Sequence, residues 1–416
     1  MRIMVLAGGP DQAALIREIK STYPDSYVIL VDMNSKAVAS KVADKHLVIS
    51  TMDFDKVKQA ALDEQIDMIM TACGDQPLLT MGLVSEELKL PCYLSMSQIL
   101  NLTNKKHMKK LMVENDIPTS KYKSFNSIEK IEDSGLNYPL IVKPADSNGS
   151  KGVRKVNNIE ELMREAEVSM KYSISNTIIV EEFVEGEDVS SDFYITNGKV
   201  YHLMDCLSNK YKPNSGTAVI YQSLIPAPVN PDFNERIQVI AEKIAEVFEI
   251  HNSPLLIQTI VKGNDIHVIE FSARLGGGAK YKTIETVTGF NVLKANLNSM
   301  LGKTPLIDYY RNNKKYSRCH LYTKGGVLSQ IKGLESLLDK HLIEDYFINR
   351  APGSVLSAPS SSGDRVASIL LSAPSIQELE DKITEVMNSI EIISDNGENI
   401  FLKEMYNPPI KNANGI

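Results

Sequence analysis

Residues 266–278 read Ile-His-Val-Ile-Glu-Phe-Ser-Ala-Arg-Leu-Gly-Gly-Gly, an apolar run that carries polar side chains and ends in three glycines. Glu270, Ser272 and Arg274 are spaced by twos, so an extended strand places all three on one face. A carboxylate, a hydroxyl and a guanidinium on one face suit a divalent metal, its phosphate ligands and the charge that develops on them. The glycines at 276–278 let backbone N–H groups approach an anion without obstruction. The stretch therefore indicates phosphate chemistry.

The same stretch belongs to a predicted hairpin, which indicates an antiparallel sheet. Strands at Leu255–Val261 and Ile266–Ala273 are joined by Lys-Gly-Asn-Asp. Antiparallel pairing brings Gln258 close to Glu270 on one face, where both can reach one or two Mg²⁺ ions. An ordinary polar pair on a hairpin is the alternative. The nearby Arg274 and the glycines favour the metal site.

Upstream of the hairpin, residues 138–200 predict an α+β lobe built on an antiparallel sheet. Lys143 ends its first strand, and residues 145–152 read Ala-Asp-Ser-Asn-Gly-Ser-Lys-Gly. A lysine beside such a loop can hold nucleotide phosphates by its charge and by backbone N–H groups. The Walker pattern is absent, and a plain hairpin loop with a solvated lysine is the alternative.

An acidic segment follows in the same lobe. Residues 179–188 read Ile-Val-Glu-Glu-Phe-Val-Glu-Gly-Glu-Asp. These acids can receive an adenine amino group and ribose hydroxyls. For the segment taken alone, a surface strand with solvated acids is the simpler interpretation.

The two ends of the chain are predicted to be α/β units. Residues 1–100 alternate apolar strands with helices in a Rossmann-like way, and residues 304–416 contain strands and a capped helix. Lys-rich residues 101–120 predict one helix, and residues 283–300 predict another. Gly8-Gly9 followed by Asp32 lacks the Gly-x-Gly-x-x-Gly spacing, so dinucleotide binding is not favoured.

Composition limits the function classes. The 416 residues carry a formal net charge of −7 and have no long apolar run, so neither nucleic acid nor a membrane is expected as a partner. Four dispersed cysteines without a Cys-x-x-Cys pair argue against zinc or a disulfide framework and fit a reducing cytoplasm. The seven histidines lack metal-ligand spacing.

Taken in this order, the motifs resemble those of the ATP-grasp superfamily of carboxylate–amine ligases, and in particular its carbamoyl-phosphate-synthase-like and L-amino-acid-ligase-like members. The resemblance covers nearly the whole chain. It implies a mixed α/β and α+β fold with a Rossmann-like domain at 1–100, an ATP-grasp domain at 101–303 and an α/β domain at 304–416. A lid lobe at about 118–184 and a catalytic antiparallel sheet would lie within the ATP-grasp domain.

The resemblance also implies roles for individual residues. Lys105 and Lys143 would touch ATP phosphates, and Arg274 with Glu270 and Lys143 would be catalytic. Gln258 and Ser272 depart from the usual acid and Asn of the family's metal site. The residues expected to bind nucleotide besides the two lysines are Ser147, Asn148, Gly149, Ser150 and Gly152 of the lid loop, Glu181, Glu182, Phe183 and Val184 of the hinge, and Asp188 at the ribose. The expected metal ligands are Gln258, Glu270 and Ser272.

Substrate residues are predicted from the same resemblance and from charge. Arg274 with Gly276, Gly277 and Gly278 would bind the acyl phosphate, whereas Arg318 and Arg365 would pair with a substrate carboxylate. Residues 208–222 are expected to form a loop near the acceptor pocket. Ordinary surface positions are the alternative for the two C-terminal arginines and for this loop.

The expected function is ATP-dependent ligation of a small carboxylate and an amine, on amino-acid-like substrates, with ATP and Mg²⁺ or Mn²⁺ as cofactors. An acyl phosphate would form with release of ADP, and an amine would then convert it to an amide. The alternatives are a purine-biosynthetic or carbamoyl-phosphate-synthase-like enzyme and a non-catalytic nucleotide-binding module. The missing Val-Glu-His pattern after position 258 argues against a biotin carboxylase. A homodimer is the assembly considered.

Overall fold

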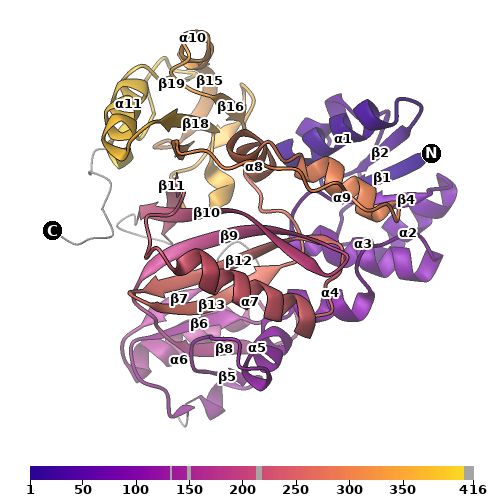
Figure 1. Cartoon of the computed structure of the whole chain (residues 1–416), viewed down its shortest axis with the longest axis vertical. Coiled ribbons are helices and arrows are strands. Elements are labelled where there is room, and N and C mark those ends of the chain that lie inside the picture. Colours follow the sequence, from indigo (N-terminus) through magenta and orange to yellow (C-terminus); the bar gives the residue numbers. More distant parts are fainter. Residues whose placement is uncertain (132–133, 148–150, 212–217, 407–416) are drawn as a thin grey trace.

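A computed structural model describes residues 1–131, 134–147, 151–211 and 218–406 of the chain. The N-terminal part is a parallel α/β unit, with strand order β3-β2-β1-β4 (Figure 1). Ile3–Leu6 is fully buried, which explains its unbroken apolar run, because a strand covered on both faces has no polar face. The elements are β1 (Arg2–Leu6), α1 (Pro10–Thr22), β2 (Tyr27–Val31), β3 (Lys45–Leu47), α2 (Phe54–Asp63), β4 (Met68–Met70) and α3 (Asp75–Leu88).

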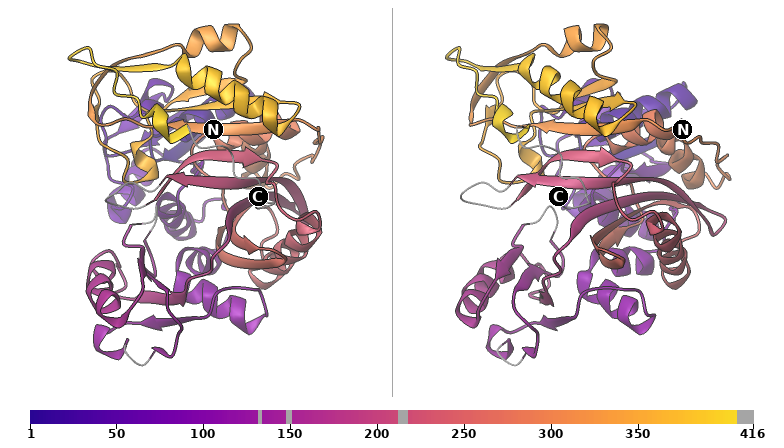
Figure 2. Two further views of the ribbon diagram at one scale, coloured as in Figure 1. Left: turned by 90° about the vertical axis from the view of Figure 1, so that its left-hand side faces the viewer. Right: turned by 60° about the vertical axis from the view of Figure 1, so that its left-hand side comes forward.

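A separate lobe contains a four-stranded antiparallel sheet of order β5-β8-β6-β7. Its own small core forms where Leu162 and Ala166 of the covering helix pack against the strands. The lobe lies at the opposite end of the molecule from the C-terminal strands (Figure 2). Its elements are β5 (Tyr122–Phe125), β6 (Leu140–Pro144), β7 (Arg154–Val156), α6 (Ile159–Met170) and β8 (Ile178–Glu182).

The central sheet has eight strands in the order β13-β12-β9-β10-β11-β14-β18-β16, and every neighbouring pair is antiparallel. The sheet continues past residue 304, because its last three strands come from the C-terminal segment. The division of the chain at 100 and 303 stays a prediction. The strands are β9 (Glu187–Thr196), β10 (Lys199–Tyr211), β11 (Val219–Ile225), β12 (Ser253–Lys262), β13 (Asp265–Ser272), β14 (Lys315–Leu321), β16 (Asp345–Ile348) and β18 (Ala367–Ala373).

Helices and a small fourth sheet complete the fold. Helix α7 buries Ile237, Ala241 and Ile244 on one face, which is the helical spacing of its apolar residues. The small sheet has the order β17-β15-β19. These elements are α7 (Phe233–Val247), α8 (Lys280–Thr288), α9 (Val292–Met300), β15 (Gly326–Lys332), α10 (Leu334–Asp339), β17 (Val355–Leu356), α11 (Ile376–Asn388) and β19 (Glu391–Ser394).

Two predicted helices are each broken in two. The expected helix at 101–120 is divided between α4 (Met96–Thr103) and α5 (Lys105–Glu114). Asn104 between them is extended, and its side chain accepts from the N–H groups of Lys106 and His107. The expected helix at 283–300 ends early and restarts, because Gly289 adopts a φ of +76° and Asn291 caps α9. The first break matters for the site, since it places Lys105 at a helix start.

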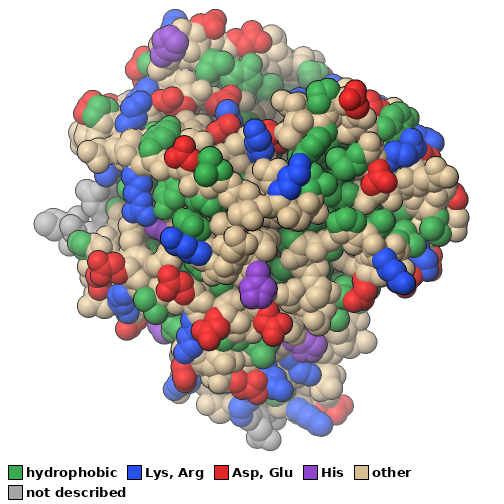
Figure 3. Space-filling view, turned by 45° about the vertical axis from the view of Figure 1, so that its right-hand side comes forward, with side chains coloured by type: hydrophobic (Ala, Val, Ile, Leu, Met, Phe, Trp, Pro, Cys, Tyr) green, Lys and Arg blue, Asp and Glu red, His purple; other side chains and the backbone are tan. Residues whose placement is uncertain are grey.

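The molecular surface carries charges of both signs. On the face shown in Figure 3, Lys and Arg side chains are interspersed with Asp and Glu side chains. Among the described residues, no helix is both long enough and apolar enough to span a membrane.

Candidate active site

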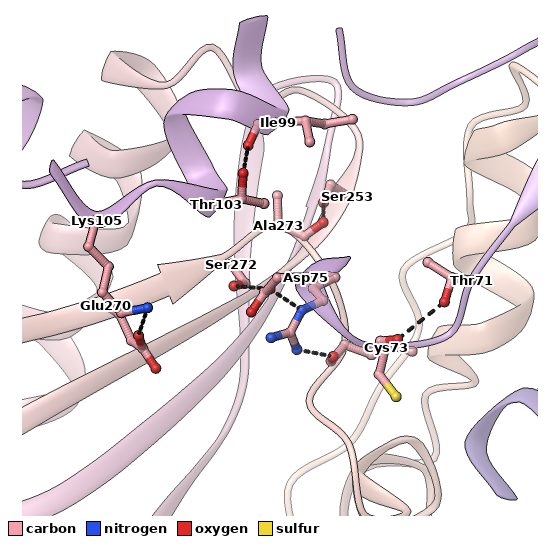
Figure 4. A network of polar contacts seen from close by, with 12 residues as sticks. Thr71, Cys73, Asp75, Ile99, Thr103, Lys105, Ser253, Glu270, Ser272 and Ala273 are labelled. Carbon is pink, nitrogen blue, oxygen red and sulfur yellow. Dashed lines mark hydrogen bonds and ion pairs between the residues drawn. The ribbon is translucent and has the colours of Figure 1, made fainter. Parts of the chain in front are cut away.

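The β12–β13 hairpin places Gln258 directly opposite Glu270, as the sequence predicted. Lys105 approaches this pair from the start of α5, and its Nζ lies 3.3 Å from a Glu270 carboxylate oxygen (Figure 4). The same Nζ donates to the Ser147 carbonyl at 2.9 Å. Glu270 is 38% exposed, so its carboxylate is accessible to a ligand. The hairpin, α5 and the lid loop therefore meet at one polar point.

Lys143 lies in the lid sheet and contacts a buried carboxylate. Its Nζ is 2.5 Å from Glu181 on the neighbouring strand β8, and a second lysine, Lys109 of α5, lies 2.7 Å from the other oxygen of Glu181. Burial alone would raise the pKa of Glu181, but the two ammonium groups lower it to about 2. The Glu181 side chain is thus a buried anion shared by two lysines.

Two backbone N–H groups of the hinge at the end of β8 are hydrogen-bonded within the protein. The Glu182 N–H donates to the Lys121 carbonyl and the Phe183 N–H donates to the Pro139 carbonyl, each at 2.9 Å. Among the described residues, Val184 is the first position after them whose backbone makes no hydrogen bond to another backbone group. A backbone contact to adenine at this hinge stays a prediction and would use Val184.

The remaining predicted nucleotide contacts are only partly visible. Asn148, Gly149 and Ser150 lie outside the described residues. Gly152 packs against Pro144 at the end of β6, since an added Cβ would lie 2.9 Å from the Pro144 ring. Asp188 is paired with Lys210 of β10. A ribose contact would have to share Asp188 with that lysine.

Arg274 and Ser272 converge on a carboxylate that the sequence did not single out. Asp75, at the start of α3, accepts from the Arg274 Nε at 2.5 Å and from the Ser272 hydroxyl at 3.0 Å (Figure 4). Burial alone would raise the pKa of Asp75, but Arg274 holds it below its usual value. The N-terminal unit therefore orients the predicted catalytic arginine.

The backbone of the glycine triplet differs from the expectation in one respect. Gly278 N–H and Ala279 N–H donate to the two carboxylate oxygens of Asp11, at 3.1 and 2.9 Å. Asp11 belongs to the first turn of α1, so the protein's own carboxylate occupies the anion position that these two N–H groups form. A substrate anion at the Gly278 N–H would therefore have to replace Asp11, and the substrate role of Gly276, Gly277 and Gly278 stays a prediction.

Arg318 and Arg365 both lie against Gly278, so the two guanidinium groups are close enough together to bind one substrate carboxylate, as predicted. The Arg318 Nη1 donates to the Gly278 carbonyl at 3.1 Å, and an added Cβ on Gly278 would lie 2.7 Å from the Arg365 Nη1. His320 lies beside them and is fully buried, and burial together with both arginines lowers its pKa well below the usual value. Neither arginine has a carboxylate within 4 Å among the described residues.

The predicted acceptor loop at 208–222 is largely strand. Residues 208–211 end β10 and residues 219–222 begin β11, and the two strands pair antiparallel. Its central positions 212–217 lie outside the described residues. The prediction missed the strands because the segment is rich in polar residues, which hide the alternation of apolar and polar side chains expected of a strand.

Four residues near the site were missed in the sequence, namely Asp11, Asp75, Lys109 and Lys280. Lys280 of α8 donates to Ser190 at 2.9 Å and pairs with Asp192 at 2.7 Å, beneath Gly276. Lys109 had a local signal, because it follows Lys105 by four positions and shares its helix face. The two aspartates follow strand ends at helix starts, a position typical of functional groups in α/β units.

A substitution at Gly278 tests whether the close approach of Arg365 to this glycine matters for stability and turnover. Gly278→Ala forces a Cβ onto a residue with φ of +75° and into the Arg365 guanidinium, so we expect a loss of stability above about 1 kcal/mol and at least tenfold slower turnover. Gly263→Ala is the matched control, because φ is +57° there and nothing lies within 4 Å. Urea unfolding and ADP release measure both effects. Equal behaviour of the two variants would contradict the assignment.

Two stretches of the chain match known protein families. Residues 136–282 match the ATP-grasp domain, and residues 320–394 match the L-amino acid ligase C-terminal domain 2. The curated phosphoribosylamine–glycine ligase of Lactococcus lactis subsp. lactis is 22% identical over 325 residues, which cover 74% of this chain and 77% of that protein.

Two solved structures share the fold over almost the whole chain. The L-amino acid ligase from Bacillus licheniformis has a TM-score of 0.76 at 19% identity and covers 95% of this chain and 99% of its own. The biotin carboxylase domain of Hydrogenobacter thermophilus 2-oxoglutarate carboxylase, in complex with MgADP, ADP and bicarbonate, has a TM-score of 0.78 at 16% identity, with 97% and 92% covered. Both family matches lie in the order that the sequence predicted, and the chain therefore belongs to the ATP-grasp superfamily of ligases.

Proposed function

We propose that this enzyme joins a small carboxylate to an amine, with conversion of ATP to ADP and phosphate through an acyl phosphate. The observation that carries the proposal is the order of charged side chains along β13 and the residues that follow it. Lys105 pairs with Glu270 at one point of the strand, and Arg274 follows four residues later beside the glycine triplet. Strand β13 would thus supply the phosphate end of the site and the residues just after it the acyl end, as transfer of a phosphoryl group from ATP to a carboxylate requires.

Mg²⁺ is the metal that the family implies, and the residues present fit it. The accessible Glu270 carboxylate lies across from the Gln258 amide oxygen, and both are oxygen ligands of the kind that Mg²⁺ prefers. No three His, Cys, Asp or Glu side chains of the described residues form a metal cage, which fits an ion held mainly by nucleotide phosphates. When bound, the ion would neutralise phosphate charge. Ser272 would be a ligand only if it left Asp75, and Mn²⁺ would suit the same donors.

The chain's own residues then have separate tasks. Lys105 and Lys143 bind the phosphates by charge-assisted hydrogen bonds. Arg274, held in one orientation by Asp75, stabilises negative charge on the acyl group as it is phosphorylated and then attacked by the amine. The lid lobe, which carries Lys143, would cover the nucleotide and exclude water that hydrolyses an acyl phosphate.

Unpaired positive charge supports an amino-acid-like substrate. Arg318 is 6% exposed, and although its Nη1 donates to the Gly278 carbonyl, its Nε is unsatisfied and no carboxylate of the described residues lies within 4 Å of it. A buried guanidinium without a directly paired carboxylate is costly. A substrate carboxylate would compensate Arg318 and Arg365 together. The match of residues 320–394 to the L-amino acid ligase C-terminal domain 2 points in the same direction.

A purine-biosynthetic activity is the second candidate, because a curated relative is a phosphoribosylamine–glycine ligase. One experiment separates the two. ADP release is measured with Mg-ATP over pairs of amino acids and over phosphoribosylamine with glycine, and products are identified by mass. We expect dipeptide products from amino acids alone. Product only from phosphoribosylamine would favour the second candidate, and absence of ADP release from every pair would contradict both. A cytoplasmic location and a homodimer stay predictions.

A further inference from the structure

Lys109 lies against Glu181, the carboxylate that pairs with Lys143, but it belongs to none of the sequence motifs. Its Nζ donates to the Thr119 hydroxyl at 2.7 Å and to the Ser120 hydroxyl at 3.1 Å, and it lies 2.7 Å from Glu181. All three N–H groups of this ammonium are therefore satisfied inside the protein. With a side chain 1% exposed, Lys109 cannot reach a nucleotide itself.

The three charges of this cluster do not cancel. Lys143, Glu181 and Lys109 together carry one net positive charge when all are ionised. Without Lys109, the Lys143–Glu181 pair would be neutral overall, and its attraction for phosphate would fall accordingly. The charge available to ATP at this point thus depends on a lysine that does not touch ATP.

The same geometry explains how Lys143 can change partner. A Lys143 ammonium that turns from Glu181 to a phosphate leaves a carboxylate that is 4% exposed without that partner. An uncompensated buried carboxylate is strongly unfavourable. Lys109 and the Ser120 hydroxyl, which donates to Glu181 at 2.9 Å, keep the anion satisfied during the exchange.

We propose that Lys109 is a positioning residue that neutralises Glu181 and so releases the charge of Lys143 for the nucleotide phosphates. The inference rests on the proposed function, because it assumes that Lys143 binds ATP. Lys109 acts through Glu181 and Lys143 rather than on the reacting atoms.

Binding of Mg-ADP and Mg-ATP by calorimetry to the full chain tests this. Lys109→Met is expected to weaken binding about tenfold, since it removes the net charge of the cluster. The double variant Lys109→Met with Glu181→Gln restores one positive charge on Lys143, so we expect binding within about threefold of the wild type. A merely structural role of Lys109 predicts no such rescue. Thermal unfolding without nucleotide shows whether each variant folds.

The pH dependence gives a second readout. Burial lowers the pKa of Lys109 to about 8, although Glu181 opposes that shift. The groups around it are Glu181 on β8, Lys143 on β6, Glu270 on β13 and the Tyr122 ring on β5, 5.3 Å away. As pH rises through about 8, Lys109 loses its proton and the cluster loses its net charge. Nucleotide binding should therefore weaken above pH 8 in the wild type and stay level in the double variant.

Lys143→Met separates this inference from the proposed function. If Lys143 binds phosphate, this variant should lose about a hundredfold in affinity. Unchanged affinity in Lys143→Met would overturn the nucleotide assignment of Lys143. A loss there combined with wild-type binding by Lys109→Met, or with no rescue in a folded double variant, would overturn the role of Lys109 alone.

Discussion

Glu270→Gln is expected to reduce ADP formation at least about a thousandfold, equivalent to about 4 kcal/mol of transition-state stabilisation. The substitution keeps the shape of the side chain and removes the carboxylate that pairs with Lys105 and faces Gln258. The measurement is coupled ADP release with the acid and amine found in the substrate screen. Because Glu270 is partly exposed and lies on a strand held by its backbone ladder, the fold should persist.

Glu391→Gln is the matched control, since Glu391 is an exposed carboxylate on another strand, β19. We expect that variant to keep wild-type turnover. A second expectation concerns the metal, because Glu270→Gln should raise the Mg²⁺ concentration needed for nucleotide binding. Turnover that survives in Glu270→Gln would remove this residue from the proposed phosphate end of the site.

Arg274→Ala is expected to have two large effects of different origin. Turnover should fall at least about a thousandfold, because the charge next to the glycine triplet is lost. Stability should fall by about 3–5 kcal/mol, because the Arg274 guanidinium no longer offsets the charge of the largely buried Asp75 carboxylate. Turnover is followed by ADP release, and stability by urea unfolding.

The double variant Asp75→Ala with Arg274→Ala distinguishes the two effects. Removal of both charges should recover much of the stability while turnover stays low, since the buried anion is gone and the arginine is still missing. Arg274→Lys keeps a charge but loses the planar fork, so we expect partial recovery of stability and little recovery of rate. Recovery of turnover in the double variant would mean that Arg274 serves only to neutralise Asp75.

Much of the fold and one side of the site were predictable from local sequence. The spacing of Glu270 and Arg274 on an apolar strand, and the turn that pairs Gln258 with Glu270, depend on neighbours within about a dozen positions. Short-range patterns of this kind survive in a single sequence because strand periodicity and turn chemistry are local. The fold class and the superfamily predicted from the ordered motifs are confirmed.

The partners of these residues were decided by the tertiary structure. Asp75 orients Arg274 from 199 positions away, and Asp11 takes the N–H groups of Gly278 and Ala279 from 267 and 268 positions away. No local pattern predicts such contacts, because they depend on how the N-terminal unit packs against the central sheet. The sequence by itself thus determined the hairpin that places Glu270 opposite Gln258, for which phosphate chemistry is the predicted role. Only the packing of distant elements decided which charges are paired, buried or left for a ligand, since electrostatic energies depend on distance and burial rather than on position in the chain.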